Sequence, residues 1–396
     1  MSTEVDIQEA FEKIQAKQHE ETANTWKLRR TLKGPAYTSA ETWEAEKERL
    51  LFAEWFCVGR EEEIVEPGDF MVRPVGDETI IIARGKDGGL RAFYNVCAHR
   101  GTKLCDDGAG QHAKSGVFKC PYHAWTYDMD GNCVGTPNVH EEEGFDKSTR
   151  PLWKVTVDSW EGFVFVNLTE GGATETLAES FQRNPEGDPH AYSRWNMKDL
   201  RVAYRIDYDV AANWKIVIDN YNECLHCPSV HPELVQLVPL FRKGLVETEW
   251  GASLVEGATT LTMDGTTTRP PLPGLEEQDK NKYLGFLLYP MLMLNMHSDC
   301  VMTYRLEPRG PGHTTVVSEY LFPPEVIASP GFDPGDIVAF WDMVSRQDWG
   351  ICEREQTGVG SRAYAEGGVY PWNDRWVYEF NERYRESMGE PEPKPF

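Results

Sequence analysis

The sequence contains little positive charge and no long hydrophobic run. Its 40 lysine and arginine residues stand against 64 aspartate and glutamate residues, which gives a formal net charge of −24. Such an acidic chain repels phosphate groups, so we expect neither nucleic acid nor an anionic membrane as a partner. The longest apolar run, residues 283–296, is interrupted by Pro290 and Asn295 and is too short to span a bilayer.

Two other signals are missing as well. Residues 1–21 are charged throughout and contain no apolar segment of the kind that a secretory signal needs, so we expect a cytoplasmic protein. The chain contains nine cysteines. In the cytoplasm these are expected to be reduced, catalytic or metal-bound rather than paired in disulfides. Their uneven clustering favours metal for some of them.

The chain is long enough for two domains, each with its own core, at 396 residues. Residues 1–50 are predicted to be helical, because Phe11, Ile14 and Trp43 are spaced among Glu, Lys and Gln. Residues 51–165 contain short β-branched runs separated by turn-forming pairs such as Asp130-Gly131, which predicts an all-β domain.

Residues 166–396 mix the two kinds of pattern, and we predict an α+β fold for them. A helix is expected from about Ala211 until Pro228 ends it, and strand-like runs return in "CVMTYRLEP" and "TTVVSEYLF". A long helix is predicted over residues 334–356, with Asp333 as its N-cap and Gly358 as its stop.

Two pairs of metal-ligand side chains lie inside the predicted all-β domain. The pairs are Cys97-x-His99 and Cys120-x-x-His123, each placed after a strand-like run. Two cysteines and two histidines fit either a tetrahedral zinc ion or a [2Fe–2S] cluster with cysteine on one iron and histidine on the other. The spacing alone does not decide between these two groups.

A second dense stretch, "DNYNECLHCPSVH", covers residues 219–231 and permits two interpretations. The first is a zinc site made of Cys224, Cys227, His226 and His231. The second uses Glu223-x-x-His226-x-x-x-x-His231. On a continuous helix Asp219, Glu223 and His226 would share one face, and Pro228 would then break the helix and allow His231 to turn back toward the same metal.

The long C-terminal helix supplies one further candidate ligand. Its apolar stripe, which includes Phe340, Val344 and Ile351, also contains Asp348. A buried carboxylate needs a cationic partner. Asp348 is therefore either the third ligand of a two-histidine, one-carboxylate Fe(II) site or the partner of a local arginine such as Arg346.

The flanking residues identify a family resemblance. "CAHRG" followed by "CPYHAW" resembles the cluster-binding loops of Rieske proteins, and Tyr122 stands where respiratory Rieske proteins hold a disulfide cysteine. Two departures are Ala124, where the family usually has glycine, and a slightly long gap that contains His112. With the Glu-x-x-His-x-x-x-x-His motif, the chain resembles the α-subunits of Rieske non-haem iron oxygenases from about Trp55 to Gln356.

This resemblance implies an all-β Rieske domain followed by a helix-grip catalytic domain, in which an antiparallel sheet is combined with long helices. It implies one [2Fe–2S] cluster and one mononuclear Fe(II) per chain. The implied cluster ligands are Cys97, His99, Cys120 and His123, and the implied iron ligands are His226, His231 and Asp348.

The resemblance also implies partners and an electron path. Glu223 would be the acidic bridge that carries electrons from a neighbouring subunit's Rieske histidine, with Asp219 as the second candidate, and Cys224 and Cys227 would have no ligand role. The chain would form a homotrimer, because a head-to-tail ring brings the two centres of neighbouring subunits together. Electrons would come from NAD(P)H through a separate flavin and iron–sulfur reductase, and O2 would be the co-substrate.

Within the family, "NWKIVIDNYNECLHCPSVHPEL" looks most like the branch that acts on choline, carnitine and betaines. The implied reaction is hydroxylation of a carbon next to a quaternary nitrogen, followed by N-demethylation or C–N cleavage. Aromatic side chains would hold the cation, with Tyr221, Phe286, Tyr289 and Trp349 as candidates. The alternatives are an aromatic-ring or aryl-ether Rieske oxygenase, an electron-transfer Rieske protein and a structural zinc protein.

Overall fold

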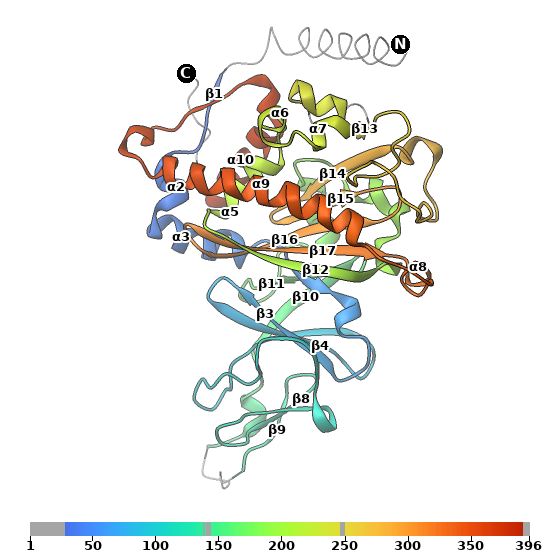
Figure 1. Ribbon diagram of the computed structural model, residues 1–396. Helices are drawn as coiled ribbons and strands as arrows, with labels where there is room; N and C mark the ends of the chain where they lie inside the picture. The colour runs from blue at the N-terminus through green and yellow to red at the C-terminus, as the bar shows by residue number, and fades with distance from the viewer. Residues whose placement is uncertain (1–27, 138, 140–143, 246–249, 391–396) are drawn as a thin grey trace. The chain divides into compact units, whose positions relative to one another are not determined.

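The computed structural model describes residues 28–137, 139, 144–245 and 250–390 (Figure 1). These residues form two compact units. One unit consists of residues 47–182, and the other combines residues 28–46 with residues 183–390. Among the described residues, no helix is both long and apolar enough to cross a membrane.

The unit of residues 47–182 is built from antiparallel strands, which confirms the all-β prediction. Its larger sheet has the strand order β2-β11-β10-β5-β4-β3-β6, and a smaller sheet has the order β7-β8-β9. The strands are β2 Phe56–Arg60, β3 Asp69–Val75, β4 Glu78–Arg84, β5 Leu90–Tyr94, β6 Gly108–His112, β7 Val117–Lys119, β8 Thr126–Asp128, β9 Cys133–Gly135, β10 Lys154–Trp160 and β11 Phe163–Asn167.

The turn between β10 and β11 shows why this sequence makes tight hairpins. Glu161 and Gly162 both have positive φ, 47° and 78°. A two-residue hairpin turn with two positive φ values matches the right-handed twist of the flanking strands. The hairpins β4–β5, β8–β9 and β10–β11 are all present, and the predicted turn pair Asp130-Gly131 lies between β8 and β9.

The second unit contains a six-stranded antiparallel sheet with long helices against it. The strand order is β12-β17-β16-β15-β14-β13. Its strands are β12 Arg201–Val210, β13 Ala252–Ser253, β14 Lys282–Leu288, β15 Leu292–Met296, β16 Val301–Gly310 and β17 His313–Phe322. Its principal helices are α5 Trp214–Tyr221, α9 Gly335–Val359 and α10 Arg375–Met388. This arrangement confirms the predicted combination of an antiparallel sheet with long helices.

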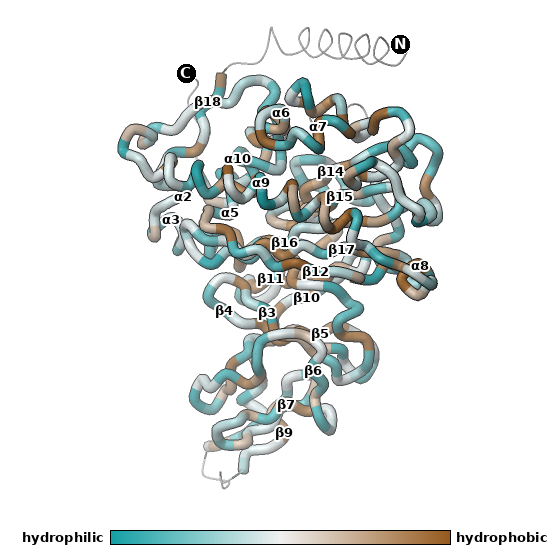
Figure 2. The backbone as a smooth tube through the Cα atoms, viewed as in Figure 1, coloured by the Kyte–Doolittle hydropathy of each residue, from teal (hydrophilic) through white to brown (hydrophobic). Residues whose placement is uncertain are grey.

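The core of this unit lies between the sheet and helix α9, which crosses the sheet in Figure 1. All five residues of β15 are buried, and Ile337, Phe340 and Val344 of α9 are buried as well. Figure 2 shows hydrophobic segments gathered along the strands around β16. The predicted ends of α9 are each slightly wrong, because Pro334 is the N-cap and the helix runs through Gly358 to Val359; Asp333 lies one residue before the N-cap and accepts a hydrogen bond from the Gly335 backbone N–H over 2.8 Å.

The predicted N-terminal helical segment belongs to the second unit rather than standing alone. Its described part in that unit contains β1 Arg29–Arg30, α2 Gly34–Thr38 and α3 Ala40–Glu46, whereas the short π-helix Lys47–Leu51 belongs to the all-β unit. Glu46, buried at the end of α3, pairs with buried Lys215 of α5 and accepts a hydrogen bond from Tyr384 of α10 over 2.8 Å. Phe11 and Ile14 lie outside the described residues.

The prediction that a helix runs as far as Cys227 is wrong at the C-terminal end. Helix α5 begins where Asn213 accepts a hydrogen bond from the Lys215 N–H, and it ends at Tyr221. Beyond it, the Glu223 carboxylate accepts the backbone N–H groups of Leu225 and His226, which replaces helical hydrogen bonding there. A separate short helix, α6, covers Cys227–Val230, and α7 covers Leu234–Leu237.

Candidate functional site

Two loops of the all-β unit bring the first four predicted ligands together. Cys97 follows β5 and Cys120 follows β7, and their side chains are only 1% and 2% exposed. The Cys97 N–H donates to the Thr102 carbonyl over 2.9 Å, and the Cys120 N–H donates to the Trp125 carbonyl over 2.8 Å. The rings of His99 and His123 lie 4.8 Å apart, centroid to centroid.

The side chains at these loops fit a Rieske cluster. Cys97 and Cys120 lie in the apolar core of the unit, whereas both imidazoles are half-buried. His99 stacks on Trp125 with ring centroids 4.7 Å apart, and its buried Nδ1 atom has no hydrogen-bond partner among the described residues. Two sulfur donors on one side and two imidazole donors on the other match a cluster with cysteine on one iron and histidine on the other.

The backbone conformation of Ala124 explains why the family usually has glycine at this position. Its φ is 60°, in the left-handed region that residues with a Cβ atom rarely adopt. Its N–H donates to the Cys120 carbonyl over 3.0 Å, which closes the tight turn that holds Cys120 and His123. The departure therefore costs some backbone strain but keeps the loop geometry.

Three side chains of the second unit converge on one point. The Nε2 atoms of His226 and His231 lie 3.1 Å apart, and Asp348 Oδ1 lies 2.8 Å from the Nε2 of His231 and 3.3 Å from that of His226. A metal held about 2.1 Å from three donors at right angles would place those donors about 3 Å from one another. The triangle therefore fits one face of an octahedral metal site, which is the arrangement predicted for Fe(II).

The other nitrogen of each imidazole is also bound, and these bonds orient the rings. His226 Nδ1 lies 2.6 Å from Glu223 Oε1, and His231 Nδ1 lies 2.8 Å from Gln347 Oε1. When Nδ1 donates to an acceptor, the Nε2 lone pair is left to bind metal. Gln347 was not predicted from the sequence. The sequence signal that could have identified Gln347 is its position directly before Asp348 on α9.

The other charged residues of α9 near Asp348 make contacts elsewhere. Arg346 pairs with Asp342 over 2.9 Å, so the hypothesis that it neutralises Asp348 is wrong. Asp342 also accepts a hydrogen bond from Tyr208, and Glu353 accepts the Ala211 N–H. Burial alone would raise the pKa of Asp348, but its hydrogen bonds with the two histidines outweigh burial and hold that pKa below the usual range.

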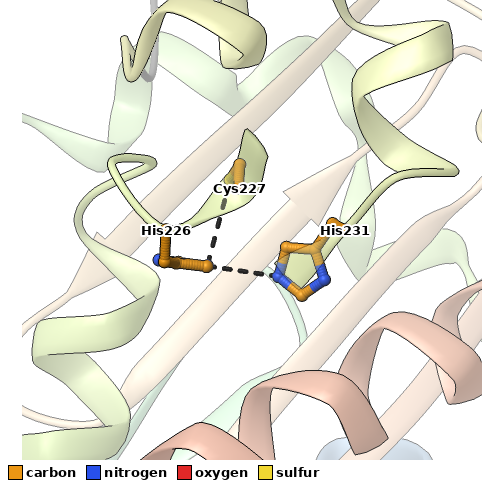
Figure 3. A group of neighbouring side chains, drawn as sticks. All are labelled: His226, Cys227 and His231. Carbon is orange, nitrogen blue, oxygen red and sulfur yellow. Dashed lines mark hydrogen bonds between the residues drawn. The ribbon is translucent and has the colours of Figure 1, made fainter. Parts of the chain in front are cut away.

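Cys224 and Cys227 form a disulfide, with their Cα atoms 5.0 Å apart. The expectation that the cysteines are unpaired is therefore wrong for these two. Cys227 Sγ lies 3.9 Å from His226 Nε2, beside the two histidines in Figure 3. Sulfurs joined to each other cannot act as thiolate ligands. The four-ligand zinc interpretation of residues 219–231 is accordingly wrong, because Asp348 takes the third position at shorter range.

Asp219 lies apart from the three ligands, because α5 ends before Glu223 and the predicted common face does not form. Its carboxylate accepts hydrogen bonds from Tyr37 over 3.1 Å and from Asn381 over 2.8 Å. Burial, with a smaller contribution from the negative charge of Glu355, raises the pKa of Asp219 to about 8.

A cavity of about 140 Å³ opens onto the three ligand side chains. Eight of its lining residues are Tyr, Trp or Phe, namely Tyr192, Tyr221, Phe241, Tyr283, Tyr304, Trp341, Trp349 and Trp376. Tyr221 and Trp349 were predicted as cage residues. Phe286 instead packs against Tyr192, with centroids 4.7 Å apart, and Tyr289 contacts Ser387 over 3.0 Å.

The glycine at position 285 keeps part of the wall open. A Cβ atom at this position would lie only 3.1 Å from the hydroxyl oxygens of Tyr221 and Tyr283.

Two family models match the two units. Residues 54–158 match the Rieske [2Fe–2S] domain, and residues 197–390 match the catalytic domain of the ring-hydroxylating α-subunit. The matched segments contain all seven predicted metal ligands, the first set in the Rieske match and the second in the catalytic match.

Named relatives are similar in both sequence and fold. The oxygenase subunit of carnitine monooxygenase from Acinetobacter pittii is 39% identical over 198 residues, which is 50% of this chain and 51% of that protein. The chain thus spans about half of that relative's length. The corresponding subunit from Escherichia coli K12 is 32% identical over 268 residues, 67% of each chain. A solved quaternary ammonium Rieske monooxygenase, described with carnitine oxidation and inter-subunit electron transfer, is 27% identical with a TM-score of 0.71, covering 91% of this chain and 96% of that one.

Proposed function

Because this chain belongs to the α-subunits of Rieske non-haem iron oxygenases, we propose that it is the oxygenase component of a monooxygenase that hydroxylates a carbon attached to a quaternary nitrogen. The observation that carries the proposal is the aromatic cavity beside the ligand triangle. A trimethylammonium group cannot donate hydrogen bonds and is held by cation–π contact with aromatic rings.

The family holds one Rieske cluster and one mononuclear iron. Cys97, His99, Cys120 and His123 would hold the cluster, and His226, His231 and Asp348 would hold the iron. When bound, the cluster supplies single electrons and the iron supplies a site for O2 next to the substrate. The overall reaction consumes O2, two electrons and two protons, and it yields one water and one hydroxylated carbon.

The protein's own residues bind and orient the substrate. The aromatic rings exclude water and direct one carbon of the ammonium group toward the triangle of His226, His231 and Asp348. Glu223 and Gln347 hold the two imidazoles in place through their Nδ1 atoms. A hydroxyl on a carbon bonded to nitrogen gives a hemiaminal-type product, which breaks the C–N bond and releases an aldehyde and an amine.

The electron path extends the proposal to partners. We assign Glu223 to the transfer of electrons from a neighbouring subunit's cluster to the iron in a homotrimer, fed by a separate reductase that oxidises NAD(P)H. Two observations support this assignment. The Glu223 carboxylate contacts the imidazole of an iron ligand, and the similar solved enzyme is described with inter-subunit electron transfer. Asp219, hydrogen-bonded to Tyr37 and Asn381, is the second candidate.

The experiment is a substrate panel on the purified chain with a reductase and both metal centres in place. Choline, carnitine, glycine betaine and proline betaine are compared with neutral aromatic acids and aryl ethers. We expect at least one quaternary compound to increase O2 and NAD(P)H consumption and to release formaldehyde, another aldehyde or an amine. If only a neutral aromatic compound did so, the function would be that of an aromatic-ring or aryl-ether oxygenase.

A further inference from the structure

The cavity beside the triangle contains carboxylates but lacks the side chains that usually bind carboxylates. Glu186, Glu223 and Asp348 contribute to its lining. None of its lining residues within the described part of the chain is a lysine or an arginine.

Arg375, which lies 5.3 Å from the ring centroid of the lining residue Trp376, pairs with Glu379 over 2.6 Å, and two further cations near the aromatic wall are also held by other groups. Arg194 lies over the ring of Trp250, 4.7 Å from its centroid, and pairs with buried Asp279 over 2.9 Å. The Lys282 ammonium donates to the Trp250 carbonyl over 2.6 Å. Neither charge is available to a carboxylate in the cavity without breaking these bonds.

The tyrosine hydroxyls of the wall are likewise used by the protein. Tyr221 donates to the Leu294 carbonyl over 3.0 Å, and Tyr283 donates to Asn295 over 2.6 Å. Tyr304 shares a hydrogen bond of 2.6 Å with Ser345. The faces of these rings can therefore contact a cation. Their hydroxyl groups, however, already donate a hydrogen bond to the protein or share one with a neighbouring hydroxyl.

Two neutral groups in the lining do lack partners. Asn222 is 5% exposed, and neither its Oδ1 nor its Nδ2 has a hydrogen-bond partner among the described residues. Trp349 is 8% exposed, and its Nε1–H is also without a partner there. Buried polar groups are nearly always hydrogen-bonded in native proteins. Two such groups in one cavity wall mark a place where a bound molecule supplies the missing hydrogen bonds.

We infer that the cavity takes a quaternary ammonium compound with a net positive charge and a neutral polar end, of the choline type, rather than a carboxylated zwitterion such as carnitine or glycine betaine. The inference rests on the proposed function and narrows its substrate class. A hydroxyl can both donate to and accept from the Asn222 amide. A carboxylate would be buried near Glu186 and Glu223 with no lysine or arginine among the described lining residues to pair with it, and an unpaired buried charge is costly.

The test is anaerobic binding calorimetry on the full chain with both metal centres loaded. The ligands are choline, tetramethylammonium, glycine betaine and L-carnitine. We expect choline to bind at least about 10-fold more tightly than either zwitterion, a difference of about 1.4 kcal/mol. Equal or tighter binding of a zwitterion would overturn the inference and leave the proposed function standing. If no quaternary ligand bound while a neutral aromatic compound did, the proposed function itself would have failed.

A variant of Asn222 tests binding of the hydroxyl end of the substrate separately from binding of its ammonium end. Asn222→Ala removes the amide but no aromatic ring. We expect choline affinity to fall about 5- to 10-fold, as for the loss of one hydrogen bond. Tetramethylammonium, which has no hydroxyl, should bind within about twofold of its wild-type affinity, because its cation–π contacts remain. An equal loss for both ligands would assign Asn222 to the structure of the wall and would contradict its role in binding the hydroxyl.

Discussion

The side-chain oxygen of Gln347 lies 2.8 Å from the Nδ1 atom of His231. Gln347 directly precedes Asp348 on α9, so one turn of helix carries the proposed ligand Asp348 and also the group that orients the proposed ligand His231. The Gln347 amide nitrogen in turn donates to Glu233 over 3.2 Å, which holds the amide with its oxygen toward His231.

Gln347→Ala should weaken iron binding by about 10- to 100-fold, the effect typical of losing a group that orients a metal-bound histidine. Titration of iron into the metal-depleted catalytic site measures this change. Gln347→Glu keeps an acceptor for His231 and should recover most of the affinity. If Gln347→Ala bound iron as the wild type does, the orienting role would be excluded.

Asp348→Ala should lose the mononuclear iron while the Rieske absorption and the fold remain. The variant removes one of the three donors that make the triangle with His226 and His231. Asp342→Ala is the matched control, because Asp342 lies on the same helix but contacts Tyr208 and Arg346. Iron analysis of both proteins should show a loss only for Asp348. The opposite result would make Asp342 the ligand.

Cys120→Ala should abolish the visible absorption and the paramagnetic signal of the cluster, since one thiolate ligand is removed outright. Cys133→Ala tests specificity, because Cys133 is also a buried free cysteine in the core of the same unit. That variant should keep the full spectrum. Retention of the spectrum in Cys120→Ala would contradict the cluster assignment.

Glu223→Gln should keep both metals but slow electron transfer between the centres. The substitution keeps the length of the side chain and removes its charge beside His226. Rapid mixing of the reduced protein with O2 and substrate measures the rate of cluster oxidation. Asp219→Asn is the comparison, and its rate should stay close to that of the wild type. If cluster oxidation were slow in Asp219→Asn and normal in Glu223→Gln, the electron-transfer role would belong to Asp219 instead of Glu223.

The buried carboxyl of Asp219 should make stability depend on pH. Its pKa is raised to about 8 in the folded chain, against about 3.9 in an unfolded one. Between these values the folded state binds the extra proton, so the contribution of Asp219 to the free energy of unfolding is fully present below about pH 4 and falls as pH rises through 8. Asp219→Asn removes this dependence. Its melting temperature relative to the wild type should therefore increase from pH 5 to pH 9, and a decrease would contradict the shift.

The proposed ligands could be predicted from the sequence because most of them lie in short motifs. Cys97-x-His99 and Cys120-x-x-His123 lie in two short loops, the segment from Glu223 to His231 surrounds the short helix α6, and Asp348 stands out as a carboxylate in an apolar helical stripe. Alternating β-branched runs likewise predicted the hairpins of the all-β unit.

The remaining features depend on contacts between distant segments, which periodicity does not encode. The early end of α5 follows from hydrogen bonds to the Glu223 carboxylate, not from Pro228. The placement of α3 with the second unit follows from the contacts of Glu46 with Lys215 and Tyr384, which lie 169 and 338 residues away. Gln347 acquires its role only because folding brings it against His231.

The Cys224–Cys227 pair changes how the iron site would assemble. His226 lies inside the small covalent ring that the disulfide closes over residues 224–227. In an open chain this segment would sample many conformations, and a metal ion arriving there would have to overcome that loss of freedom. The crosslink removes many of these conformations before any metal arrives. Reduction of the disulfide would change no ligand atom. It would nevertheless affect the iron site, because the segment that carries His226 would become more mobile.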